Sequence, residues 1–309
     1  MHIVDRSELD PALGTPVMLV ALDGFLDAGN ASALVVAHLG ASDTAGKVVA
    51  SFEVDELHDY RARRPPLTFQ QDHYTDYDAP RLVVREMTDR EGTPYLLLAG
   101  PEPDVRWEAF ARAVREVVEA LEVRLVVSLG SVPMAVPHTR PVQLTNHGTA
   151  QRLLVQRNMW AGEIRVPSSA QSLLELRLGE WGHDATGFVA HIPHYLAQLD
   201  YPAATATILE RVELAGRLTI DLTEVRLEAA KRDEEIAAYL RENDEVGEVV
   251  KALERQYDAF AHSESSGSNL LAPDQPLPTG EELGREFEQF LARLSDPGDP
   301  GSPEGEGEK

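Results

Sequence analysis

Segment 128–141 carries the polar side chains of this chain that are best suited to chemistry. His138 is a potential acid or base, Thr139 offers a hydroxyl, and Arg140 offers a cation that can hold a carboxylate or phosphate through two N–H groups. A proline on each side of these three residues stiffens the segment and helps to hold the polar groups in place. Two hypotheses have equal weight here: a functional loop, and a structural turn in which Arg140 pairs with a carboxylate of the chain itself.

The turn after the first strongly apolar segment resembles a phosphate loop only in part. Gly24 and Gly29 have the G-x-x-x-x-G spacing, but Asn30 and Ala31 follow where that motif needs Lys and Ser or Thr. Asp27 places a carboxylate in the loop, where it would repel an anion. A tight strand-to-helix turn with Asn30 near the helix N-cap is therefore the favoured interpretation. Together with segment 128–141 and the two histidines of segment 191–195, this turn gives a candidate cleft of ten residues: Asp23, Gly24, Asp27, Asn30, Ser131, His138, Thr139, Arg140, His191 and His194.

The histidine pair at His191 and His194 could in principle share a metal ion. Pro193 lies between them and disfavours a regular helix, and no H-E-x-x-H pattern is present. We therefore expect a buried, hydrogen-bonded histidine at a strand end, with no metal site and no cofactor. The sequence also lacks a G-x-S-x-G elbow and a G-x-G-x-x-G fingerprint, so no catalytic motif is complete.

Composition excludes several classes of protein. The 309 residues include no cysteine, which rules out disulfides, a thiolate nucleophile and Cys-ligated metals. With 28 Lys and Arg against 52 Asp and Glu, the formal net charge is −24, which is unfavourable for binding nucleic acid. No apolar run is long enough to span a membrane, and the first residues do not have the pattern of a signal peptide. We expect a cytoplasmic protein without a membrane partner.

Hydrophobic patterning predicts an α/β fold. Apolar runs typical of strands buried on both faces alternate with segments of helical periodicity, and residues 60–80 are expected to be irregular. Strand, helix and strand follow one another around 95–129 at the spacing of a βαβ unit. The expected strands are 17–22, 48–54, 81–87, 95–99, 124–129, 142–145 and 186–192, and the expected helices are 31–39, 105–122, 169–178 and 199–214.

The C-terminal third has a different character. Residues 223–260 predict two charged helices interrupted near Asn243, and the second helix carries an apolar stripe that needs a partner surface. That partner is either the chain's own core or another subunit. We divide the chain into an α/β core at 1–222, a helical extension at 223–262, and a region at 263–309 with a linker, a short helix at 281–294 and a disordered acidic tail. The stripe comprises Val246, Val249, Leu253, Tyr257 and Phe260.

Five sequence blocks between residues 17 and 260 resemble the bacterial branch of the proteasome assembly chaperone family. They are VMLVALDGFLDAGNAS, AGPEPDVRWEAF, VPHTRPVQLT, AHIPHYLAQLDYPAATATILE and LERQYDAF. The resemblance implies a three-layer α/β sandwich with a mixed central sheet, similar to nucleoside phosphorylases, followed by a C-terminal helical extension. It also implies self-association, with a trimer as the expected oligomer, and contacts with proteasome subunits.

Three functions are compatible with these observations. The favoured one is a non-enzymatic, self-associating protein that acts through protein contacts. The first alternative is a small-molecule site or enzyme in a phosphorylase-like cleft, with Arg140 binding an anionic or carbonyl group and His138 as acid or base. The second is an ATP-dependent carboxylate–amine ligase, for which the four lysines are a thin supply. The chain ends Gly307-Glu308-Lys309 and not in a hydrophobic–Tyr–any tripeptide, so the resemblance does not imply docking into proteasome pockets through this end.

Overall fold

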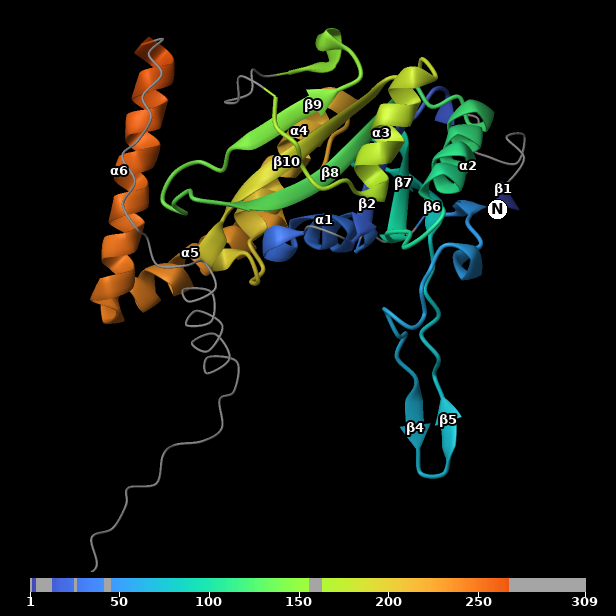
Figure 1. The fold of residues 1–309 in the computed structure, drawn as a ribbon, viewed down its shortest axis with the longest axis horizontal. Helices are drawn as coiled ribbons and strands as arrows, with labels where there is room; N and C mark the ends of the chain where they lie inside the picture. Colours follow the sequence, from blue (N-terminus) through green and yellow to red (C-terminus); the bar gives the residue numbers. More distant parts are fainter. Residues whose placement is uncertain (1, 4–12, 25–26, 42–45, 156–162, 267–309) are drawn as a thin grey trace, which may run out of the picture.

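The computed structural model describes residues 2–3, 13–24, 27–41, 46–155 and 163–266, with side chains as far as residue 259. A mixed eight-stranded sheet lies between two layers of helices (Figure 1). The predicted α/β sandwich with a mixed central sheet is confirmed. The expected short helix at 281–294 and the acidic tail lie outside the described residues.

Four parallel strands form the centre of the sheet. β2 pairs in parallel with β7 and β8, and β8 pairs in parallel with β10. The remaining strands join antiparallel at the two sides, which makes the sheet mixed. In the order β1-β3-β6-β7-β2-β8-β10-β9, the strands are His2–Ile3, Val48–Ser51, Val83–Thr88, Pro94–Pro101, Val17–Asp23, Leu125–Met134, Ala185–Pro193 and Leu144–Gly148.

Helices cover both faces of the sheet, so its central strands are apolar on both sides. Along β2, Met18 and Val20 belong to one buried cluster, with α2 (Trp107–Ala120) and α3 (Ala170–Glu180). Leu19 and Ala21 belong to the other, with α1 (Ala31–Gly40) and α4 (Pro202–Gly216). This two-sided burial explains why the strands read as continuous apolar runs and not as alternating ones.

Local sequence explains where the helices begin and end. In α3, the Ser169 hydroxyl accepts the Ser172 N–H, while the Ser172 side chain accepts the Ser169 N–H, which is a capping box. Pro202 begins α4 at a position where its missing N–H costs nothing. α5 (Thr223–Glu242) and α6 (Asp244–Ser266) are separated at Asn243, as predicted. Asn243 donates its side-chain N–H to the Tyr239 carbonyl, 2.9 Å away, and so satisfies the end of α5.

The stripe on α6 lies against the chain's own core. Val246 and Leu253 are buried in the cluster of α1 and α4, and Val249 packs at its margin. The Tyr257 hydroxyl accepts a hydrogen bond from the Gln143 side chain at 2.6 Å. The side chain of Phe260 lies outside the described residues. α6 thus covers apolar surface at the end of the sheet where β8 and β10 finish, as Figure 1 shows.

Residues 60–80 depart from the expectation of an irregular segment. β4 (Thr68–Gln70) and β5 (His73–Thr75) form an antiparallel ribbon that projects from the body (Figure 1). No hairpin signal is present in the sequence here, because the two strands are short and no two-residue turn with Gly joins them. The predicted strand at 48–54 was also too long, because residues Val54–Glu56 form a 3-10 turn. We call residues 60–80, with the ribbon at their centre, the arm.

Because both faces of the sheet are buried, truncating a buried side chain on either face should lower stability by a similar amount. Met18→Ala and Leu19→Ala each remove a fully buried side chain, one from each cluster. Each should lower the free energy of unfolding by about 2–5 kcal/mol, measured by urea denaturation. Leu227→Ala, at an exposed position on α5, is the control and should change it by less than about 0.5 kcal/mol. A small loss at only one of the two buried positions would mean that one face is not covered.

Candidate functional site

The crevice between β2 and β8 is where an open α/β sheet of this topology would bind a ligand. β2 stays paired with β7 as far as Asp23, but it pairs with β8 only from Val17 to Val20. The carboxyl ends of β2 and β8 therefore separate. Of the predicted cleft residues, Asp23 ends β2, Gly24 follows it, Ser131 lies on β8, and Asp27 forms a parallel bridge to Ser131.

Asp27 closes one side of the crevice. Its carboxylate accepts the backbone N–H groups of Ser32 at 2.7 Å and Ala33 at 2.9 Å, which are the free donors at the start of α1. The same carboxylate accepts the Ser131 hydroxyl of β8 at 3.1 Å. Asn30 occupies the N-cap position, as predicted, but its side chain does not cap the helix. It donates instead to Asp200 at 2.7 Å. The chain's own carboxylate thus takes the place that a phosphate would need.

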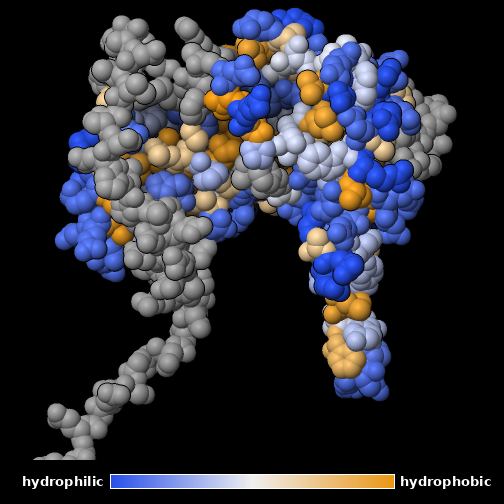
Figure 2. All heavy atoms as spheres, viewed as in Figure 1, coloured by the Kyte–Doolittle hydropathy of each residue, from blue (hydrophilic) through white to orange (hydrophobic). Residues whose placement is uncertain are grey.

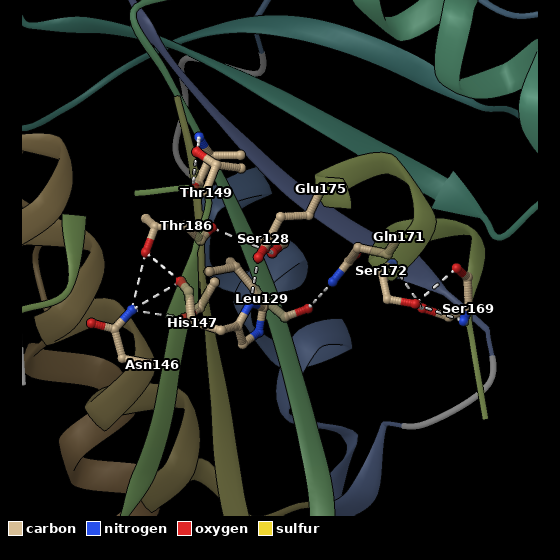
Figure 3. Close-up of polar contacts among 12 residues, drawn as sticks. Ser128, Leu129, Asn146, His147, Thr149, Ser169, Gln171, Ser172, Glu175 and Thr186 are labelled. Carbon is tan, nitrogen blue, oxygen red and sulfur yellow. Dashed lines mark hydrogen bonds and ion pairs between the residues drawn. The ribbon is translucent and has the colours of Figure 1, made fainter. Parts of the chain in front are cut away.

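Gln171 and Glu102 close the other side. The Gln171 side chain donates to the Leu129 carbonyl of β8 at 2.8 Å, and its oxygen lies 3.4 Å from the Leu22 amide of β2 (Figure 3). It therefore satisfies backbone groups of both diverging strands. Glu102 accepts the first N–H of α3, from Ala170, at 2.6 Å. Gly24 lies so close to the Glu102 side chain that a Cβ would collide with it.

The predicted residues His138 and His194 come together around Tyr195, which the sequence did not single out. The Tyr195 hydroxyl lies 2.7 Å from Nδ1 of His138 and accepts the His138 backbone N–H at 3.0 Å. Both imidazoles meet the Tyr195 ring edge-on, with centroids 5.9 and 5.5 Å away. The turn at Gly29 lies alongside, because its N–H donates to the Ala197 carbonyl at 2.7 Å.

Burial keeps these three rings uncharged. It lowers the pKa of His138 to about 4, lowers the pKa of His194, and raises the pKa of Tyr195. A general acid or base works best with a pKa near the working pH. None of the three groups is tuned toward neutrality, so this cluster is better suited to packing than to proton transfer at pH 7.

Arg140 is engaged by α6. Its guanidinium holds Asp258 through two bonds, Nε to Oδ1 at 2.8 Å and Nη2 to Oδ2 at 2.6 Å, and lies 3.4 Å from Glu254. The neighbouring Thr139 hydroxyl donates to Glu254. The two carboxylates, Asp258 foremost, raise the pKa of Arg140. Of the two hypotheses for this segment, the geometry matches the structural one, in which Arg140 pairs with carboxylates of the chain and ties the loop between β8 and β9 to α6.

His191 and the backbone of Asp23 make hydrogen bonds within the fold. His191 is buried, and its Nε2 lies 2.8 Å from the Thr145 hydroxyl of β9. Burial lowers its pKa. The carbonyl of Asp23 accepts the Glu102 N–H at 2.8 Å and an N–H of Arg63 at 3.3 Å. Among the described residues, no group of three or more His, Asp or Glu side chains is arranged to hold a metal ion.

A polar cluster that the sequence did not indicate joins α3 to the sheet (Figure 3). Glu175 accepts Ser128 at 3.2 Å through one oxygen and pairs with Nδ1 of His147 at 2.8 Å through the other. A Cβ on Gly187 would collide with both partners of Glu175. The three residue types are those of a catalytic triad, but Ser128 donates to the carboxylate and not to the imidazole. The cluster therefore lacks the nucleophile–base bond of a hydrolase and serves to dock α3.

Asp27 should contribute measurably to stability. Asp27→Ala removes both hydrogen bonds to the start of α1 and the bond from Ser131, so we expect a loss of about 1–2 kcal/mol in the free energy of unfolding. Urea denaturation measures it. Asn30→Gly, three residues on, is the matched variant and should cost less, because Gly tolerates the left-handed backbone at this position (φ 49°) and Asn30 makes no cap bond. Equal losses would contradict the assignment of the cap to Asp27.

His138 should make stability depend on pH. Its folded pKa of about 4 lies below the usual value of 6.5, so the unfolded chain binds a proton that the folded chain excludes. The contribution of the neutral His138 side chain to the free energy of unfolding is complete above pH 6.5. It is lost progressively as the pH falls toward 4, by up to about 3 kcal/mol. His194 and His191 act in the same direction. Urea denaturation at pH 7.5 and 5.0 should show a smaller decline for His138→Gln than for the wild type. An unchanged decline would refute the assignment.

The chain is similar to a family model and to several solved structures. The model of the PAC2 family matches residues 21–240. The crystal structure of Rv2714 from Mycobacterium tuberculosis, a protein of unknown function, is similar at 45% identity, with 91% of each chain covered and a TM-score of 0.76. A Corynebacterium glutamicum protein of unknown function shares 36% identity, with 81% of this chain and 92% of that chain covered and a TM-score of 0.76.

A third solved structure adds a functional description of a relative. Mycobacterium tuberculosis Rv2125, described as a proteasome-assembly chaperone homologue, shares 26% identity, with 76% of this chain and 99% of that chain covered and a TM-score of 0.70. Among curated proteins, none matches the chain. The family model spans most of the sheet and its helices, and the chain belongs to the PAC2 family.

Proposed function

We propose that this chain is a self-associating protein of the assembly-chaperone type, which acts through protein contacts and has proteasome subunits as partners. Membership of the PAC2 family and the description of Rv2125 support the class of function. The candidate cleft is occupied by the chain's own side chains, which supports a role in protein contacts more than a role in catalysis. Asp27, Gln171 and Glu102 fill the crevice from inside, and Arg140 is held by α6.

The arm is the observation that carries self-association. β4 and β5 pair only with each other in the part of the chain that the structure describes. A two-stranded ribbon on its own is marginally stable in water. Phe69 and Tyr74 lie opposite each other in the ribbon with ring centroids 5.0 Å apart, yet 60% and 70% of their surfaces are exposed. Figure 2 shows apolar side chains along this projection.

A second copy of the chain is the occupant that we propose for this ribbon. Leu67 and Tyr77 extend the exposed apolar surface toward the body. Exposed aromatic residues are typical of the centre of protein interfaces. The ribbon projects well clear of its own subunit, so a neighbouring subunit can reach it (Figure 1). A trimer is the oligomer that we propose, following the resemblance to the family.

Light scattering coupled to gel filtration tests self-association. The full-length wild type should elute as an oligomer with three times the mass of the chain. Phe69→Ser with Tyr74→Ser should shift it toward the monomer, because the two substitutions remove the exposed aromatic pair. Leu227→Ser, which alters an equally exposed apolar residue on α5, should leave the oligomer intact. A monomeric wild type would exclude self-association. A double variant that stays oligomeric would show that the interface lies elsewhere than on the arm.

Binding of proteasome subunits needs its own experiment. Purified α- and β-type proteasome subunits from the same organism are mixed with the full chain and separated by gel filtration. We expect the chain to co-elute with α-type subunits or with a half-assembled particle, and to change the rate at which complete particles form. Serum albumin at the same concentration is the control for crowding. No co-elution together with an unchanged assembly rate would exclude the proteasome as partner and leave self-association standing.

A further inference from the structure

A shallow cavity of about 490 Å³, wide open to solvent, lies at the root of the arm, where the arm joins the body. Phe52, Val54 and Pro80 give it apolar walls, and Tyr60 and Tyr77 contribute aromatic rings from the two ends of the arm. Glu53 and Asp55, on either side of Val54, add two carboxylates to the lining. This cavity is separate from the crevice between β2 and β8 and from the apolar ribbon.

Among the residues that the structure describes, the lining of the cavity carries negative charge and no positive charge. Both Glu53 and Asp55 are exposed to solvent at the rim. Tyr60 donates its hydroxyl to Asp55, and this carboxylate raises the pKa of Tyr60 to about 12, so the phenol stays protonated. None of the nearby arginines lines the cavity.

Two of those arginines have other partners. Arg63 pairs with Asp104 at 2.9 Å and donates to the carbonyls of Asp23 and Glu102. Arg106 pairs with Glu56 at 2.6 Å. Neither arginine therefore neutralises Glu53 or Asp55, and the bond that Asp55 accepts from the neutral Tyr60 hydroxyl leaves its negative charge in place.

We propose that this cavity binds an organic cation, a guanidinium or alkylammonium group. Aromatic faces attract such cations, and carboxylates at the rim complete their hydrogen bonds. An anion would be repelled by two negative charges. A neutral apolar ligand would strip water from the carboxylates without replacing the lost hydrogen bonds. An arginine or lysine side chain of a protein and a free polyamine share this chemistry.

This inference goes beyond the proposed function and does not depend on it. Self-association is assigned to Phe69 and Tyr74 at the ribbon, whereas the cation site uses Asp55 and Tyr60 at the root, with Tyr77 lying between the two surfaces. The double variant at the ribbon leaves all the cavity residues in place. Cation binding by that variant can therefore be measured whatever its oligomeric state.

Isothermal titration calorimetry of the full chain at 150 mM NaCl tests the charge requirement. The probes are N-acetyl-arginine amide, spermidine, and N-acetyl-citrulline amide, which matches the arginine probe in shape but is neutral. We expect the two cations to bind and the citrulline probe to bind at least 10-fold more weakly. Tighter binding of the arginine probe identifies a protein side chain as the natural ligand, and tighter binding of spermidine identifies a free polyamine. Equal binding of the arginine and citrulline probes overturns the proposal.

Two substitutions separate the cavity from general attraction to an acidic protein. Asp55→Asn should weaken binding of the arginine probe at least 10-fold, whereas Asp72→Asn, an exposed carboxylate at the ribbon turn, should leave it unchanged. Glu53→Gln is the second cavity variant, in case Asp55→Asn unfolds the turn, and thermal melting checks each fold. The proposal is overturned if Asp72→Asn weakens binding as much as the cavity variants, or if neither cavity variant weakens it.

Discussion

The separation of β2 from β8 is the constraint on which the rest of this molecule depends. Both strands are buried on two faces, so the backbone groups that they expose on separating cannot all turn to water. They need hydrogen-bond partners from the protein or from a ligand. Here the partners are internal: Gln171 meets both strands on one face, and Asp27 joins Ser131 to the start of α1 on the other. The position that a ligand would occupy in this topology has become part of the structure.

The polar groups around the crevice are bonded to one another and are not open to a ligand. With the start of α1 capped by Asp27 and the start of α3 capped by Glu102, the helix ends at the crevice no longer present their first N–H groups. The loop after β8 is likewise tied to α6 through Arg140 and Asp258. Exposed aromatic side chains lie on the ribbon of the arm, where Phe69 and Tyr74 pack against each other and are otherwise open to solvent.

The sequence predicted the layers of the fold better than the arrangement of the site. Apolar runs and helical periodicity located seven of the eight strands of the sheet and the helices α1 to α6, because burial on both faces produces continuous apolar runs. The two-residue edge strand β1 was not predicted. The break at Asn243 was also visible. The contacts of Gln171, Glu175 and Tyr195 were not, because each reaches a residue more than 25 positions away. Such pairings depend on packing, which local patterns do not record. The arm was missed because its strands are only three residues long and no Gly turn joins them.

The net charge of −24 gives the arm a physical role. Two such bodies repel each other at close range, and this repulsion opposes any interface made directly between their acidic surfaces. At physiological salt the repulsion fades over about 8 Å, so a contact held away from the body experiences less of it. The ribbon holds Phe69 and Tyr74 at such a distance, where burial of aromatic surface can outweigh the remaining charge. At its root, the same negative field draws cations toward Asp55. One projection thus separates two kinds of recognition: an apolar one at its ribbon and an electrostatic one where it meets the body.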